Sequence, residues 1–410
     1  MIYISDYNIH EISLSDIQKV AVVGTHLHRW QGEDNDSIPH VIRQQAMVQL
    51  DPLNPAGRNH DIFFQSRISS YDTNKFQKTV YPNKLVFEAY YPNLMAISKE
   101  HFPIFLPQMK KEFLHKYYQS RIEKIEKLHV GILDEAVKFL SENGPSKAAD
   151  IGEMANIKPD FSFWKTSNLA GMALEMLWLL GKAVISDRDE NWRKIYNLTE
   201  EYFDSEILEK TDLTHEEISY KKFLIKQKSY PLITLGKVSI SKAGSLFVGK
   251  RKRISPEWFR TNYSDKNPHI LKTEGEQWGV AVPYNWKDFL KENLDDNMRA
   301  IAPLDPLIWD RDLTLKVFDF DYVWEVYKIP KDRKWGYYVY PLLFQGKLIG
   351  RTEVKFDKKT LNLEFFNLQL EDSFEPDNST ETAFINLTKR WKNMLKAKTI
   401  TSDRSIKFMN

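Results

Sequence analysis

The chain has 410 residues, with 58 Lys and Arg against 56 Asp and Glu, so its formal net charge is +2. This length is typical of two to four domains, and 42% hydrophobic with 28% charged residues is typical of a globular protein. Because the chain has no cysteine, disulfide frameworks, cysteine-ligated zinc or iron–sulfur sites and cysteine nucleophiles are excluded.

Neither a targeting segment nor a membrane span is expected. The N-terminal stretch MIYISDYNIH lacks the basic region and apolar segment of a secretory signal. The most apolar run, Leu169 to Ile185, contains Glu175 and Lys182 and is too short and too charged to cross a bilayer. We therefore expect a cytoplasmic protein without a membrane partner, and a monomer is the default expectation.

Pattern changes along the chain predict four regions, 1–120, 121–205, 206–295 and 296–410. In the first region, Leu14 to Val23 follows the possible cap Ser13 and reads as a helix. A second helix is expected over Val41 to Val48. Pro52 and Pro55 then prevent helix continuation, so Gln49 to Asp51 is expected at a helix end or in a short strand, before an apolar-rich element over 61–68.

The second region has the element order of a winged helix. A helix is expected over 122–140, a short helix over 146–154 and a strong helix over 169–180, and a two-stranded hairpin over 182–198 follows. A generic α+β unit is the alternative interpretation. The third region, with a helix over 216–226 and extended segments over 232–240 and 245–248, resembles a second winged-helix order less clearly.

The fourth region is predicted to consist mainly of strands. Residues 318–329, 336–343, 347–356 and 361–368 alternate or run apolar, and a helix is expected over 380–395. This pattern predicts an antiparallel β-barrel-like domain or a strongly curved sheet. The expected fold class is therefore α+β, with tandem winged-helix units followed by this C-terminal β-domain.

The strongest candidate for chemistry lies in VQLDPLNPAGRNHDIFFQSRI, residues 48–68. In an extended segment Gln49 and Asp51 project to one face while Leu50 points to the core. A carboxylate beside an amide can bind and polarise a water and can stabilise a cationic transition state. The alternative is purely structural: Asp51 before Pro52 would fix an Asx-type turn, with Arg58 paired to Asp61.

Other motifs do not complete a site. GSLFVGKR, residues 244–251, nearly fits a phosphate loop, but Arg251 stands where Ser or Thr must hold magnesium. His26 and His28 are spaced like ligands on a strand, yet no acidic pair completes a metal site, so surface histidines are the better interpretation. We therefore expect no metal and no cofactor.

Around Gln49 the sequence resembles the AlkZ-like (AlkZ/YcaQ-like) winged-helix DNA glycosylases, which unhook interstrand crosslinks and excise bulky alkylpurines. That family is marked by a Gln-aliphatic-Gln or Gln-aliphatic-Asp signature, and Gln49-Leu50-Asp51 matches the second form. The similarity continues through Asn54, Arg58 and FFQSRISSY (63–71), and returns in IAPLDPLIWDR (301–311) and in residues 318–351.

The resemblance implies tandem winged-helix units and a C-terminal β-domain around a DNA-binding cleft. It also implies a monofunctional, metal-free glycosylase in base excision repair that hydrolyses the N-glycosidic bond of N7-alkylated purines, including interstrand crosslinks. Asp51 would stabilise an oxocarbenium-like sugar and orient or deprotonate the water that Gln49 positions. The partner would be double-stranded DNA carrying alkylated bases.

The sequence departs from the family pattern at one place. Many relatives carry an aromatic-Ala-His-Glu stretch that aligns with Tyr90-Tyr91-Pro92-Asn93, so Pro92 and Asn93 replace its His and Glu. This departure affects the expected substrate range more than the fold. His60 or Glu88 would be the residues to compensate.

DNA-binding residues are expected by their chemical type. Arg58 and Arg67 would contact phosphate, Asn54 would join them and His60 would approach the lesion, while the basic, aromatic turn at 330–336 would probe the duplex. Trp164 and Lys165 would contact the backbone, with core packing as the alternative for Trp164. The residues expected to bind DNA are thus Asn54, Arg58, His60, Arg67, Trp164, Lys165, Arg333, Lys334 and Trp335.

Two other functions stay open from the sequence. A non-catalytic winged-helix DNA-binding protein or regulator would bind DNA without releasing a base, although a regulator usually dimerises and no heptad pattern is sustained here. A small-molecule hydrolase using Asp51 in a cleft is the third possibility. Basic stretches at 250–272 and 389–407 favour the nucleic-acid partner, with a solvated surface as their alternative interpretation.

Overall fold

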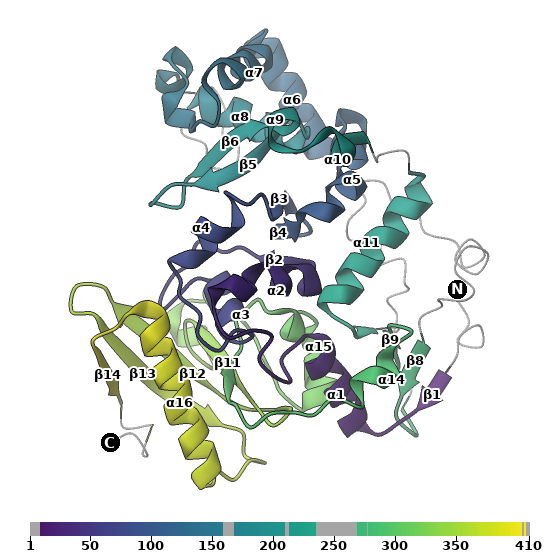
Figure 1. Cartoon of the computed structure of the whole chain (residues 1–410), viewed down its shortest axis with the longest axis vertical. Helices are drawn as coiled ribbons and strands as arrows, with labels where there is room; N and C mark the ends of the chain where they lie inside the picture. The colour runs from purple at the N-terminus through teal and green to yellow at the C-terminus, as the bar shows by residue number, and fades with distance from the viewer. Residues whose placement is uncertain are drawn as a thin grey trace. The chain divides into compact units, whose positions relative to one another are not determined.

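The computed structural model describes residues 9–158, 168–209, 213–234, 269–276, 278–403 and 406. By its internal contacts the chain divides into two units (Figure 1). Unit 1 consists of Met1–Phe76, Leu224–Ile240 and Ser255–Asn410, and unit 2 of Gln77–Phe223 and Ser241–Ile254. The division into four regions stays a prediction.

The first helices of unit 1 follow local capping signals. Helix α1 (Leu14–Gly24) begins where the Ser13 side chain accepts a hydrogen bond from the Asp16 N–H, as the sequence predicts. The helix expected over 41–48 is instead α2 (Ile38–Gln45) followed by strand β2 (Met47–Gln49). It ends early because Ala46 has a positive φ of 62°, which an α-helix cannot continue.

A four-stranded sheet and one continuous core complete this part of unit 1. The strand order is β1 (Ile9–Glu11), β8 (His269–Lys272), β9 (Val280–Val282) and β7 (Ile233–Thr234). Buried apolar side chains of α1, β8 and β9 pack in one cluster with Phe320, Tyr322 and Leu343 from the C-terminal region. The extended segments expected over 235–240 and 245–248 lie outside the described residues.

The C-terminal region of unit 1 contains a curled half-barrel sheet. The strand order is β10 (Arg299–Ala300), β11 (Val339–Phe344), β12 (Lys347–Asp357), β13 (Asn362–Leu370) and β14 (Thr399–Ser402). Helix α16 (Asn378–Leu395) lies along this sheet, and its Trp391 ring packs 4.9 Å from the Tyr340 ring and 5.6 Å from that of Phe365 (Figure 1).

Two expectations for this region are corrected. The sheet is not wholly antiparallel, because α16 carries the chain back along the sheet and β14 then pairs parallel to β13. Residues 319–329 form no strand; helix α15 (Arg311–Phe318) precedes them, capped by the Asp310 side chain. The alternating aromatics Phe320 and Tyr322 are buried in the core, so packing explains a periodicity that suggested a strand.

Unit 2 contains the helices and the hairpin expected in the second region. The predicted helix over 122–140 is two helices, α6 (Lys116–Leu128) and α7 (Ile132–Asn143), because the chain breaks at Gly131. Helix α8 (Leu169–Leu179) starts at Asn168, whose side chain accepts from the Gly171 N–H. The antiparallel strands β5 (Ala183–Arg188) and β6 (Lys194–Leu198) confirm the hairpin.

The remaining elements are short apart from α11 (His215–Ser229), which confirms the helix expected over 216–226. Unit 2 also contains the hairpin of β3 (Val86–Tyr90) and β4 (Leu94–Ser98). The short helices are α3 (Asn59–Gln65), α4 (Lys75–Val80), α5 (Phe102–Phe105), α9 (Thr199–Tyr202), α10 (Ser205–Glu209) and α14 (Trp286–Phe289). In the part of the chain that the structure describes, no helix combines the length and apolarity needed to cross a membrane.

Candidate functional site

The segment between β2 and α3, residues 50–58, carries Asp51 and is called the catalytic loop below. Asn59 ties both ends of its surroundings together. Its Nδ2 donates to the Gln49 carbonyl at 2.9 Å, and its Oδ1 accepts from the Leu304 N–H at 3.0 Å. One buried amide therefore connects the strand before the loop with the 301–311 segment, far away in the sequence.

The middle of the catalytic loop is held by the C-terminal region. The Trp391 indole N–H donates to the Ala56 carbonyl at 2.7 Å, and the Phe356 N–H donates to the Pro55 carbonyl at 2.9 Å. Gly57 has a φ of +108°, and a Cβ there would lie 3.2 Å from Met394 Cε. Only glycine fits this turn against α16, so the loop is fixed by its backbone contacts.

Asp51 is the half-buried carboxylate of this loop. Leu50 is buried, as the extended interpretation requires, and Gln49 is 8% exposed. Asp51 Oδ1 accepts from the Leu53 N–H at 2.9 Å, so the Asx-type turn of the structural alternative is present at this oxygen. No described residue donates to Oδ2. Burial raises the pKa of Asp51, and the single bond from Leu53 lowers it only in part.

The start of α3 is braced by a second, fully buried carboxylate. Asp61 accepts from the Arg58 N–H at 2.8 Å and from the Tyr71 hydroxyl at 3.0 Å, and burial raises its pKa to about 6 despite these bonds. The His60 ring is buried, with its centroid 4.4 Å from that of Phe76. His60 therefore lies in the interior, which corrects the expectation that it approaches a lesion.

Arg67 is also corrected. Its side chain is fully buried, and its guanidinium forms two hydrogen bonds with Asp305, at 2.8 and 3.2 Å. Further bonds go to the carbonyls of Thr25 and Phe63. A guanidinium so enclosed cannot meet a phosphate without breaking a buried ion pair, so Arg67 is a core residue here.

Residues 330–338 form the second part of the site and are called the basic turn. Two carboxylates hold its backbone. Buried Glu325 accepts from the N–H groups of Lys334 and Trp335 at 3.0 and 2.7 Å, from that of Gly336 at 3.4 Å and from Lys328 Nζ at 2.8 Å. Burial alone would raise the pKa of Glu325, but these donors outweigh it and lower the pKa to about 2.

Glu353 of β12 holds the following residues of the basic turn. It accepts from the N–H groups of Tyr337 and Tyr338 at 2.8 and 3.0 Å, and from Asn367 Nδ2 at 3.1 Å. Gly336 has a φ of +149°, and a Cβ there would lie 2.4 Å from Glu353 Oε2. The turn thus depends on a glycine that leaves room for the carboxylate.

The three side chains expected to contact DNA in this turn differ in exposure. Lys334 is exposed and its Nζ lies 2.7 Å from Asp321, and Arg333 lies over the exposed Tyr337 ring at 4.8 Å. Trp335 is half-buried, with the Arg351 guanidinium 3.6 Å from its ring centroid. Arg333 and Lys334 are therefore the accessible cations of the turn.

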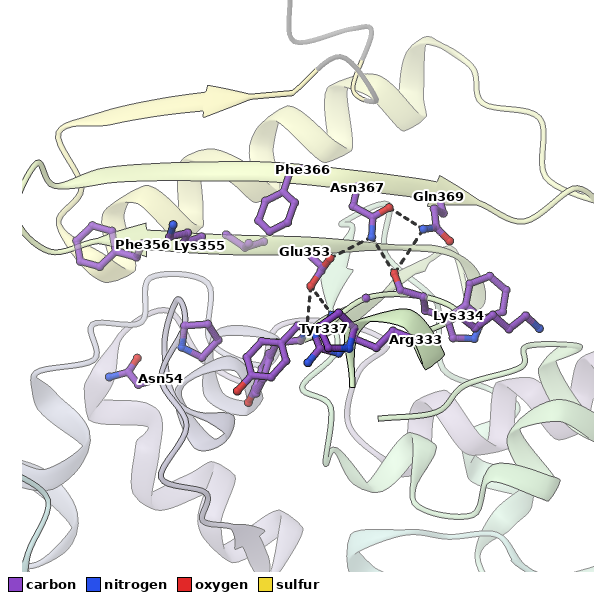
Figure 2. A pocket seen from close by; sticks show the side chains of 16 residues that line it. Asn54, Arg333, Lys334, Tyr337, Glu353, Lys355, Phe356, Phe366, Asn367 and Gln369 are labelled. Atoms are coloured by element: carbon purple, nitrogen blue, oxygen red, sulfur yellow. Dashed lines mark hydrogen bonds between the residues drawn. The ribbon is translucent and has the colours of Figure 1, made fainter. Parts of the chain in front are cut away.

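A pocket of about 760 Å³ lies between the catalytic loop and the basic turn (Figure 2). Figure 2 shows Asn54 on one side and Glu353, Asn367 and Gln369 joined by hydrogen bonds on the other. The Asn54 Oδ1 accepts from the Gly57 N–H at 3.0 Å. The pocket wall is aromatic, basic and amide-bearing, with residues Asn54, Pro55, Pro330, Arg333, Lys334, Trp335, Gly336, Tyr337, Tyr338, Glu353, Val354, Lys355, Phe356, Phe366, Asn367 and Gln369.

Several expected residues lie elsewhere. Trp164 and Lys165 fall outside the described residues. Glu88, suggested as compensation for the missing motif, lies inside unit 2, where it accepts from Arg188 at 2.8 and 2.6 Å and from the Tyr81 hydroxyl at 2.6 Å. Among the described residues, no three His, Asp or Glu side chains gather as metal ligands.

The sequence did not single out the residues that build the basic turn. Glu325 and Glu353 act from 10 and more residues away, and no local motif marks a glutamate that accepts from backbone N–H groups. Tyr338, on the pocket wall, was hidden in an apolar run that predicts a strand.

Comparison with known protein families matches residues 42–220 and 271–386 to the family described as DNA glycosylase AlkZ-like. The chain belongs to the AlkZ-like DNA glycosylase family. The matched segments contain both the catalytic loop and the basic turn, and they cover well over half of the sequence. Membership in the AlkZ-like family supports DNA glycosylase activity in DNA repair and binding to DNA.

Proposed function

We propose that the protein is a monofunctional, metal-free DNA glycosylase that releases N7-alkylated purines from double-stranded DNA and unhooks interstrand crosslinks. One observation carries the proposal: Asp51 is a half-buried carboxylate on a loop fixed by Asn59, Trp391 and Phe356. Its raised pKa favours proton acceptance over permanent ionisation. The Gln49-Leu50-Asp51 signature and the family support the same reaction.

The proposed reaction needs little beyond charge stabilisation and a placed water. N7-alkylation puts a positive charge on the purine, so the C1′–N9 bond breaks with its electron pair going to the base, which becomes neutral. Asp51 stabilises the oxocarbenium-like sugar that forms. A water positioned by Gln49 then bonds to C1′, and its proton passes to Asp51.

DNA would be held by residues of both parts of the site. Asn54 and Arg58 belong to the catalytic loop, and Arg333, Lys334 and Trp335 belong to the basic turn; the proposal also retains Trp164 and Lys165. The accessible cations Arg333 and Lys334 would contact phosphate, while the aromatic side chains of the turn face base edges or sugars. His60 and Arg67 are left out because both are buried.

The winged-helix assignment is part of the same proposal. In unit 2 the order α6, α7, α8 and the β5–β6 hairpin supports a winged helix within 121–205, with short 3₁₀ turns at Ala148–Asp150 and Glu153–Asn156 between the second and third helices. A hairpin after three helices is the wing of such a unit.

A base-release assay tests the proposal. Duplex DNA containing one N7-methylguanine, or a nitrogen-mustard crosslink, is incubated with the protein and treated with alkali, which cuts abasic sites. Wild type should cleave both or one of these substrates, and Asp51→Asn should not. The Asn Oδ1 can still accept from the Leu53 N–H, so this variant should fold.

Two results would contradict the proposal. Cleavage by both proteins would retain the glycosylase and remove Asp51 from its chemistry. Cleavage by neither, with DNA binding intact, would favour a non-catalytic DNA-binding protein.

A further inference from the structure

Strand β11 carries two buried tyrosines on the same face, Tyr338 and Tyr340, and each hydroxyl lacks a hydrogen-bond partner among the described residues. Tyr338 is 2% exposed and Tyr340 is fully buried. A nearby tyrosine behaves differently, because the Tyr322 hydroxyl donates to the Val339 carbonyl at 3.1 Å. Since burying an unpaired hydroxyl costs free energy, two adjacent cases require an explanation.

Only Tyr338 of this pair lines the pocket, together with Asn54 and Pro55 of the catalytic loop. Its position is well fixed. The Tyr338 N–H donates to Glu353 at 3.0 Å, and its ring lies 5.2 Å from that of Tyr340 and 6.1 Å from that of Trp324. The hydroxyl therefore has a set direction and access to the pocket.

The charges around Tyr338 make its hydroxyl a lasting donor. Burial raises the pKa of Tyr338 well above its usual range, and the Asp51 carboxylate adds most to this effect, followed by Tyr322, Asp61 and Tyr337. The phenol stays protonated wherever the enzyme works, and it lies within the electrostatic range of Asp51. A donor near a carboxylate that accepts only one protein hydrogen bond suits a water held between the two.

We propose that the Tyr338 hydroxyl donates a hydrogen bond to the water that attacks C1′, so that Tyr338 and Asp51 hold this water together. The inference rests on the proposed function. When the water oxygen bonds to C1′ and the C1′–N9 bond breaks, the water proton passes to Asp51 and Tyr338 keeps its own. Tyr338 thus contacts a reacting atom and is a catalytic residue that fixes the direction of attack.

Tyr338→Phe tests this role because it removes one oxygen atom and keeps the ring. We expect base release to slow by about 10- to 100-fold, with DNA affinity unchanged and the thermal midpoint unchanged or raised. The acid limb of the rate should also move to higher pH, because the charged form of Asp51 loses a donor that acts through the shared water. A structural role would not move this limb.

Two other tyrosines provide matched controls. Tyr340→Phe removes an equally unpaired, buried hydroxyl that does not line the pocket, so its rate should stay within about twofold of wild type. Tyr322→Phe loses a hydrogen bond that the structure shows, so its thermal midpoint should fall while its pH profile stays unchanged.

The outcomes separate this inference from the function on which it rests. If wild type releases the base and Tyr338→Phe does so within twofold of its rate, Tyr338 has no part in the reaction. An equal loss in Tyr340→Phe and Tyr338→Phe would likewise overturn the inference. If wild type releases no base from either substrate, both the proposed function and this inference fail.

Discussion

The catalytic loop and the basic turn both present a carboxylate in a low-exposure setting, yet the two carboxylates differ in opposite directions. Asp51 accepts one hydrogen bond, from the Leu53 N–H, and burial raises its pKa. Glu325 accepts from three backbone N–H groups and from Lys328, and its pKa is lowered to about 2. The number of donors therefore decides which effect wins.

This difference separates a carboxylate that can react from one that builds structure. A carboxylate whose lone pairs are all engaged is stabilised as an anion and is a poor base. A half-buried carboxylate with one oxygen open to a ligand can accept a proton and face a developing positive charge. We expect the two residues to respond to substitution in opposite ways, one in activity and the other in stability.

The largest expected effect is on the side of the catalytic loop. Asp51→Asn should lower the rate of base release by at least about 100-fold, because the charge opposite the oxocarbenium-like sugar is lost. Its free energy of unfolding in urea should change by less than about 1 kcal/mol, since the amide oxygen keeps the bond from Leu53. A large loss of stability with this substitution would make Asp51 a structural residue like Glu325.

On the side of the basic turn, Glu325→Ala should lower the free energy of unfolding by about 3 kcal/mol, because several backbone donors lose their acceptor. Urea denaturation measures this change. Asp321→Ala is the matched control, since its ion pair with Lys334 is exposed and should contribute less than about 1 kcal/mol. Equal effects of the two substitutions would contradict the structural role of Glu325.

The pH dependence should separate the same two carboxylates. Glu325 stabilises the folded state above the ordinary glutamate pKa of 4.5, and this contribution is lost only as pH falls through about 2. Asp51 must be deprotonated to act, so base release should fall as pH drops through a pKa above the ordinary 3.8. Activity should therefore disappear while near-ultraviolet circular dichroism still reports a folded protein.

A control without enzyme corrects for spontaneous loss of the alkylated base in acid. If the loss of activity coincided with unfolding, the acid limb would report the fold and not Asp51.

The smallest effect is expected for the cations of the basic turn. The double variant Arg333→Ala, Lys334→Ala should reduce the slope of log affinity against log salt by up to about 1.8, or about 0.9 for each phosphate that the protein no longer neutralises. Fluorescence anisotropy with a labelled duplex at several salt concentrations measures this slope. Lys291→Ala is the control, because Lys291 is an exposed lysine of unit 1 outside the pocket.

An unchanged slope in the double variant would remove the basic turn from the DNA-binding surface. The ion pair of Lys334 with Asp321 makes the effect of that residue the smaller of the two, because phosphate must replace an existing partner.

Local signals in the sequence predicted a good part of the fold. Ser13 and Asn168 start helices α1 and α8, since their side chains accept from N–H groups three residues later. Pro52 and Pro55 correctly ended the helical pattern before Asp51. These predictions succeeded because caps and prolines act within one turn of the chain.

Expectations that depended on side-chain partners far away in the sequence did less well. Arg67 and Arg333 are alike as sequence, but Arg67 pairs with Asp305, 238 residues later, and is fully buried. Phe320 and Tyr322 suggested a strand because an irregular segment packed on a core also alternates. Neither outcome follows from the neighbouring residues.

The sequence by itself thus determined the helix starts, the Gln49-Leu50-Asp51 segment and the family to which the chain belongs. Only the tertiary structure decided which cations are accessible, which carboxylates are engaged by backbone donors, and that Tyr338 reaches the same pocket as the catalytic loop. The physical reason is that exposure and pKa depend on which distant groups surround a side chain. Folding alone brings those groups together.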